Sequence, residues 1–131
     1  MTEIQLLDAT VVRDHLDFLI RRGDRGRHAA WFLLCDRDAR PLVHVAVDDV
    51  PAEPSAAECE HIVTTIATSL AEFGDAAMLL ALTRPGQDRI GSTDRQWFHA
   101  VHEGCRRLGV GVLGVYVVTW HDIVQVQLDD V

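Results

Sequence analysis

Between residues 77 and 118 the chain passes from an apolar strand through an amphipathic helix to a second apolar strand. This order constrains the fold more than any other feature. The first strand is the nearly continuous apolar run 77–82, and the helix is predicted to begin near Asp94 and to stop at Gly109. One apolar stripe marks the helix: Trp97, Val101, Cys105 and Leu108. The following run, 110–118, is apolar on both faces, as expected at the centre of a covered sheet.

The remaining segments are predicted to form two more helices and three more strands. Asp8 or Thr10 can cap a first helix over about residues 9–22, and Ser55 with Glu58 has the spacing of a capping box. The helix after this box has a long apolar stripe that Gly74 closes: Cys59, Ile62, Val63, Ile66, Ala67, Leu70 and Phe73. Strands are predicted over residues 29–35, 42–47 and 123–128.

The predicted order is therefore α-β-β-α-β-α-β-β, an α/β fold in one domain over residues 1–131. A helix between two strands favours a parallel crossover, while the two hairpins add antiparallel edges. We expect a three-layer domain, with a mixed sheet flanked by helices. Its core spans about residues 28–128, and the helix 9–22 precedes it.

Composition narrows the class of protein. Hydrophobic residues make up 48% of the chain, but no apolar run approaches the roughly 20 residues of a membrane span, and the N-terminus has no signal-peptide pattern. The three cysteines form no C-x-x-C pair. We therefore expect a cytoplasmic protein with reduced thiols, no membrane association and no cofactor.

The charge pattern argues against nucleic-acid binding. The net charge is −8, and all twelve cations are arginine. Five arginines fall between Arg13 and Arg27, but Asp14, Asp17 and Asp24 alternate with them. This pattern is typical of a solvated helix face and loop.

Several motifs over residues 28–126 have a familiar order. The strand 32–36 reads Phe-Leu-Leu-Cys-Asp, Arg84-Pro85-Gly86 follows the middle strand, Asp94 lies near a helix start, and a Leu-Gly pair ends that helix. In this order the chain resembles the JAB/MPN metalloprotease-like fold, in particular the RadC-type domain of bacteria. The related cytidine-deaminase-like folds share the element order, but their His-x-Glu and Pro-Cys-x-x-Cys zinc signature is absent here.

The resemblance implies a zinc site that this chain has largely lost. Active members hold zinc with two histidines and an aspartate, and they use a glutamate and a serine in catalysis. Here the glutamate position falls near His28, the histidine positions fall near Leu82 and Arg84, and Asp94 takes the place of the aspartate. Gly91 takes the serine position, with Ser92 one residue later. An arginine is always protonated and cannot bind a metal, so the resemblance implies a pseudo-active site: His28, Arg84, Ser92 and Asp94.

Two interpretations of Asp94 follow. Arg84 can replace the charge of the metal and pair with Asp94, which a separation above about 6 Å would exclude. Alternatively, Asp94 is a first-turn acid favoured by the helix dipole, with Ser92 or Thr93 as N-cap and Gln96 completing a capping box with Thr93.

Other candidate ligands lie on the same helix. His99 and His102 share a face and could bind a metal with Asp94, or with His61 or Cys59, but they could equally face solvent. A nucleophilic pair of Cys105 with His102 is disfavoured, because Cys105 lies on the apolar stripe. His44 is expected to face solvent or a second subunit, and His121 and Asp122 to lie in a turn.

The leading function hypothesis is a non-enzymatic binding or scaffolding module with a homodimeric or other protein partner, which it contacts through a sheet edge or the first helix. A metal-dependent hydrolase with a rearranged site is the first alternative. A nucleic-acid-associated accessory protein related to RadC-type proteins is the second, although the acidic charge opposes it.

Overall fold

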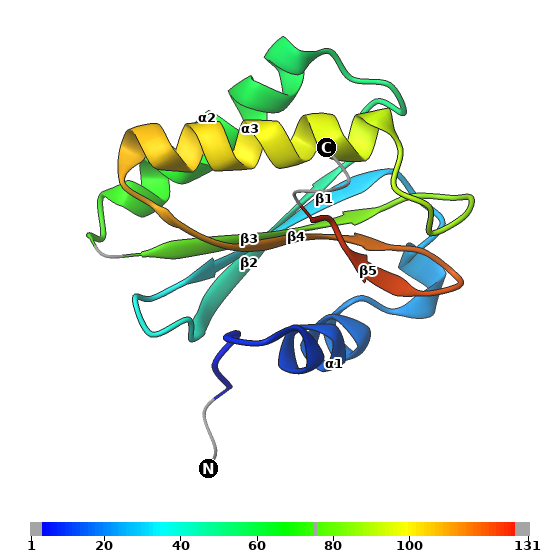
Figure 1. Ribbon diagram of the computed structural model, residues 1–131, viewed down its shortest axis with the longest axis horizontal. Coiled ribbons are helices and arrows are strands. Elements are labelled where there is room, and N and C mark those ends of the chain that lie inside the picture. Colours follow the sequence, from blue (N-terminus) through cyan, green and yellow to red (C-terminus); the bar gives the residue numbers. More distant parts are fainter. Residues whose placement is uncertain (1–3, 75, 128–131) are drawn as a thin grey trace.

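The computed structural model describes residues 4–74 and 76–127. It has three layers: α2 and α3 lie side by side over one face of a five-stranded sheet, and α1 covers the other face (Figure 1). The predicted α/β class and element order are confirmed, with a single 3₁₀ turn, η1, added after α1. The elements are α1 Ala9–Leu19, η1 Arg22–Asp24, β1 Ala29–Cys35, β2 Pro41–Asp48, α2 Ala56–Ala71, β3 Ala77–Thr83, α3 Ser92–Leu108, β4 Gly111–Val118 and β5 Ile123–Gln125.

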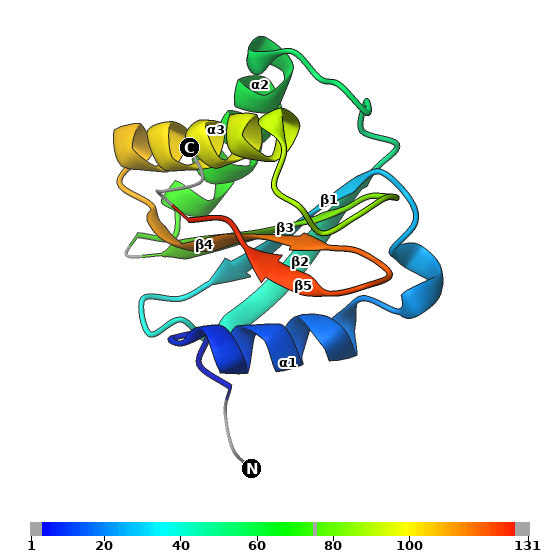
Figure 2. The same ribbon diagram turned by 45° about the vertical axis from the view of Figure 1, so that its right-hand side comes forward.

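The sheet has the strand order β2-β1-β3-β4-β5, with β2 at one edge (Figure 2). β1 runs antiparallel to both β2 and β3, whereas β3 and β4 are parallel and β4 and β5 antiparallel. Since β2 and β3 are each antiparallel to β1, they run in the same direction. Both α2 and α3 therefore connect parallel strands, and both edges of the sheet belong to hairpins, as predicted.

The strands at the centre separate two apolar cores. β3 is buried along its whole length, and β1 along all but one residue. On the α2/α3 face the core includes Phe32, Leu80 and Trp97, and on the α1 face it includes Leu16, Trp31 and Tyr116. Burial on both faces explains why these central strands read as continuous apolar runs.

The first helix is shorter than predicted. Asp8 caps it, with its carboxylate accepting the Val11 N–H at 3.0 Å, but the helix ends at Leu19 instead of near residue 22. Ile20 is fully buried, although its backbone is extended (φ −97°, ψ 107°). The apolar stripe therefore continues past the end of the helix, which is why the sequence pattern overestimated its length.

Two other predictions need correction at the ends of elements. Phe73 was assigned to the apolar stripe of α2, but α2 ends at Ala71 and Phe73 is 80% exposed. The first half of β4 is only partly buried, because β5 pairs with β4 only along Tyr116–Val118. The last strand ends at Gln125 within the described chain, and the predicted end at Leu128 lies outside the described residues.

The capping box of α2 is confirmed. The Ser55 hydroxyl accepts the Glu58 N–H at 3.1 Å, and the Glu58 carboxylate accepts the Ser55 N–H at 3.0 Å. No helix in residues 4–74 or 76–127 combines the length and the apolar character that crossing a bilayer requires.

Candidate functional site

The four residues predicted for the pseudo-active site lie around one concavity. His28, Arg84, Ser92 and Asp94 all line a depression of about 470 Å³ beside the carboxyl end of β3. Sheet register explains how His28 reaches it: Ala29 pairs with Thr83, so the residue before β1 lies next to the residue after β3. α3 begins at Ser92 and brings Asp94 to the same place.

Arg84 and Asp94 form a two-pronged ion pair. Arg84 Nε donates to Asp94 Oδ1 at 3.1 Å, and Arg84 Nη2 donates to Asp94 Oδ2 at 3.0 Å. The Asp94 side chain is 3% exposed and that of Arg84 is 18% exposed. The predicted pairing is confirmed, with a separation well inside the limit set from the sequence.

Arg84 also holds the loop that joins β3 to α3. Its Nη2 donates to the Arg89 carbonyl at 2.8 Å, and its Nη1 donates to the carbonyls of Pro85, at 3.4 Å, and Gln87. With the two bonds to Asp94, the guanidinium makes five hydrogen bonds, which equals its number of N–H donors. The side chain is therefore saturated by the protein itself.

Asp94 has a second role at the start of α3. Its Oδ2 also accepts the Gly91 N–H at 2.9 Å, and Gly91 is the N-cap residue. The predictions that Ser92 or Thr93 is the N-cap, and that Thr93 forms a capping box with Gln96, were wrong, because both residues already lie inside the helix. A carboxylate engaged by a guanidinium and a backbone N–H has little capacity left to bind a metal.

Gln96 instead links α3 to the start of α2. Its Nε2 donates to the Pro54 carbonyl and lies 3.7 Å from the Cys59 Sγ. This contact fixes the loop before α2 against α3. This contact could not be predicted from local sequence patterns, since the partners are about forty positions apart.

The alternative metal site on α3 is not assembled. Within the described residues, no group of three or more His, Cys, Asp or Glu side chains could hold a metal ion. Asp94 and His99 are five positions apart, which places them about 140° apart around the helix. The proposed ligand set of His99, His102 and Asp94 was therefore wrong, and Asp94 is committed to Arg84.

His99 and His102 are exposed, as the alternative interpretation predicted. The His102 ring packs on Phe98 with ring centroids 4.2 Å apart. Desolvation against the helix, with the neighbouring charge of His99, lowers the pKa of His102 below its usual value. His44 is also exposed, and it stacks on Trp31 at 6.2 Å.

The thiols are placed for packing. Cys35, Cys59 and Cys105 are all free and buried. Burial raises the pKa of Cys105 to about 11 and that of Cys35 to about 12, so neither is a thiolate at neutral pH. The low reactivity predicted for Cys105 is consistent with these values.

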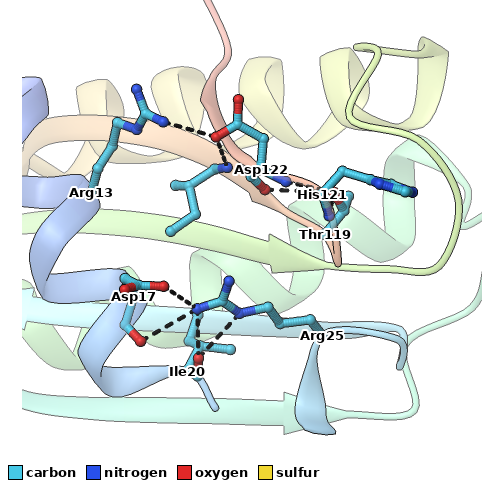
Figure 3. Close-up of polar contacts among 8 residues, drawn as sticks. Arg13, Asp17, Ile20, Arg25, Thr119, His121 and Asp122 are labelled. Atoms are coloured by element: carbon cyan, nitrogen blue, oxygen red, sulfur yellow. Dashed lines mark hydrogen bonds and ion pairs between the residues drawn. The ribbon is translucent and has the colours of Figure 1, made fainter. Parts of the chain in front are cut away.

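The arginine-rich segment also holds a polar cluster that the sequence did not reveal. Arg25 was expected on a solvated surface, but it is 3% exposed and donates from Nε and Nη2 to the Ile20 carbonyl at 3.2 and 3.0 Å (Figure 3). Its Nη2 also donates to the Asp17 carboxylate at 2.7 Å, which lowers the pKa of Asp17. The guanidinium thus satisfies backbone carbonyls at the end of α1.

Compared with protein-family models, the chain matches none, and no curated protein matches it either.

Proposed function

We propose that this chain is a non-catalytic binding or scaffolding module on a degenerate JAB/MPN-like, RadC-type domain. The observation that carries the proposal is the saturated guanidinium of Arg84, which lies where the resemblance implies a metal. It contacts Asp94, the residue that the resemblance aligns with the zinc-binding aspartate.

Charge explains why such a site would be inert. A catalytic zinc site needs three protein ligands and one open position for water. Here one candidate ligand is neutralised by a permanent cation, and the cation itself cannot bind a metal. A divalent ion brought into this depression would have to displace the guanidinium from five acceptors. We therefore assign the site a structural role, in which Arg84 organises the loop between β3 and α3.

The edge strand β2 is the surface that best supports a scaffolding role. Residues 42–47 contain no aspartate, glutamate or arginine, although the chain has a net charge of −8. Leu42 and Val43 are 61% and 55% exposed. Natural proteins usually protect a sheet edge with charges, so an uncharged apolar edge is a ready site for strand pairing. A second copy paired antiparallel along β2 would continue the sheet without placing like charges opposite one another.

The three separate, buried thiols support a cytoplasmic location as part of this proposal.

Metal content tests the proposal. Untagged protein, purified without chelators and dialysed against zinc-containing and then metal-free buffer, is analysed by inductively coupled plasma mass spectrometry. We expect far less than one zinc per chain, and no change for Asp94→Asn. One zinc per chain that is lost in Asp94→Asn would overturn the proposal and favour a hydrolase.

A further inference from the structure

A second cavity lies on the α1 side of the sheet, beyond the carboxyl end of β4. It has a volume of about 350 Å³ and is formed by α1, the segment after it, and the turn between β4 and β5. Ligand sites in open α/β sheets often lie beyond the carboxyl ends of parallel strands, and a volume near 350 Å³ is at the small end of the usual range. The cavity therefore suits a small molecule.

One nitrogen of the buried Arg25 guanidinium, with its two N–H donors, remains free. Nε and Nη2 are used by the end of α1, but Nη1 makes no hydrogen bond to any residue in the ranges 4–74 and 76–127. In Figure 3 this nitrogen is the one without a dashed line. Arg25 lines the cavity, so these donors are available to a ligand.

Some of the charged side chains that line the cavity already form ion pairs with one another. Arg13 donates to the Asp122 carboxylate at 2.8 Å, and Arg25 is paired with Asp17 (Figure 3). In contrast, the side chains of Arg22 and Asp14 form no hydrogen bond or ion pair with the described part of the chain, although the charge of Arg22 helps to lower the pKa of Asp17. The cavity thus has one cation and one anion that are not in direct contact with a counter-charge, and its arginines and aspartates balance in number.

Trp120 supplies an apolar wall. It is 51% exposed and lines the cavity, whereas Trp31 and Trp97 are buried. Gly26 lies close to the indole, since a Cβ at that position would be 2.7 Å from Nε1. A residue larger than glycine there would therefore force the indole to shift.

From these features we propose that the cavity binds a small zwitterion with a carboxylate and a protonated amine, such as a free amino acid. The carboxylate would accept hydrogen bonds from Arg25 Nη1 and Arg22, the amine would bind Asp14, and the body of the ligand would pack on Trp120. A ligand of zero net charge can pair with both Arg22 and Asp14, whereas a simple anion would leave the Asp14 carboxylate without a counter-charge. This inference does not depend on the site at Arg84.

Trp120 makes the binding measurable in the native protein. The twenty common amino acids are titrated in turn with tryptophan fluorescence and thermal stability as readouts; calorimetry replaces fluorescence for tryptophan and tyrosine. Acetate, methylammonium and inorganic phosphate serve as ligands with only one charge type. We expect at least one amino acid to give a saturable change in emission and a higher melting temperature, while the single-charge probes bind at least about tenfold more weakly.

Single-residue variants distinguish a specific loss of binding at this cavity from a general loss of stability. Arg22→Ala and Asp14→Asn should each weaken binding by about tenfold or more, because each removes a charged hydrogen-bond partner. Both side chains are exposed, so circular dichroism should show folded protein. Arg37→Ala, in the exposed turn between β1 and β2, is the matched control and should leave binding unchanged. Trp120→Phe should remove the fluorescence change but keep binding by calorimetry.

The inference is overturned if no amino acid binds at millimolar concentration, or if phosphate or acetate binds as tightly as the best amino acid. Equal affinity in Arg22→Ala and the native protein would also overturn it.

Discussion

The guanidinium of Arg84 joins Asp94 to three loop carbonyls, so its loss would leave a buried carboxylate without its counter-charge. Removing one partner of a buried ion pair usually lowers stability by roughly 3–5 kcal/mol. The expected loss is smaller here because the Arg84 side chain is partly exposed to solvent.

We expect Arg84→Ala to lower the free energy of unfolding by about 2–4 kcal/mol in urea denaturation. Arg84→Lys keeps the charge but lacks the planar fork, and should recover only part of the loss. Arg37→Ala, which removes an exposed arginine, is the control and should stay close to the native value. A native-like Arg84→Ala would show that the loop is held by other contacts.

Buried thiols give a second prediction for single residues. Burial raises the pKa of Cys35 from 9.0 to about 12 and that of Cys105 from 9.0 to about 11. The unfolded chain therefore releases these protons at lower pH than the folded chain does. Stability from this source is complete below pH 9 and is lost as pH rises toward these folded values.

Urea denaturation between pH 8 and 11 measures this effect, and Cys35→Ala should have a shallower decline than the native protein. Ellman's reagent should find no fast-reacting thiol in the native protein and three in urea. A fast-reacting native thiol would contradict the predicted protection.

The contacts of Arg84 and Arg25 differ in how far they could be predicted from the sequence. The pairing of Arg84 with Asp94 was one of two interpretations, and it came from the resemblance, which places both residues at one metal site. The role of Arg25 could not be predicted, since its partners include backbone carbonyls that are free because α1 stops at Leu19. Alternating arginines and aspartates look the same whether they face solvent or cap a helix.

At the scale of elements, the ends of the helices were the least predictable. Glycine marked the end of α3 correctly: Gly109 has φ 72° and its N–H donates to the Cys105 carbonyl. Phe73 was misassigned because an apolar residue after a stripe extends the pattern even where the chain has left the helix. The partial exposure of the first half of β4 could not be predicted, because it depends on the length of β5, a neighbour in space.

Gly109→Ala tests the end of α3. Nothing lies within 4 Å of a Cβ at this position, so the expected loss of about 1 kcal/mol comes only from the left-handed backbone. Gly23→Ala is the matched control, since its Cβ also meets nothing within 4 Å and its φ is not positive. Thermal or urea unfolding of both variants measures the difference. Equal stabilities would contradict the backbone argument.

At the scale of the whole molecule, the net charge of −8 opposes contact between copies. Residues 42–47 of the β2 edge, however, are free of acidic and basic side chains other than His44. This contrast is the physical basis for the proposed dimer.

Light scattering coupled to size-exclusion chromatography should give twice the 14.6 kDa mass of the chain. Val43→Lys should give a monomer, because two lysines near a strand–strand contact repel and are desolvated. Phe73→Lys, which changes a residue that is 80% exposed but lies outside β2, should remain dimeric. A native monomer at high micromolar concentration would refute pairing through this edge.

The position of β1 between β2 and β3 has a consequence for how the chain acquires its structure. β1 pairs first with its neighbour in sequence, but its other edge must wait for β3, which is synthesised only after all of α2; Cys35 pairs with Ala77 across that interval. Closing so long a loop slows assembly and leaves an apolar hairpin open in the meantime. A nascent chain that stops before β3 would therefore leave one edge of β1 unpaired, although β1 is buried along all but one residue in the folded domain, and such an apolar edge is prone to aggregation.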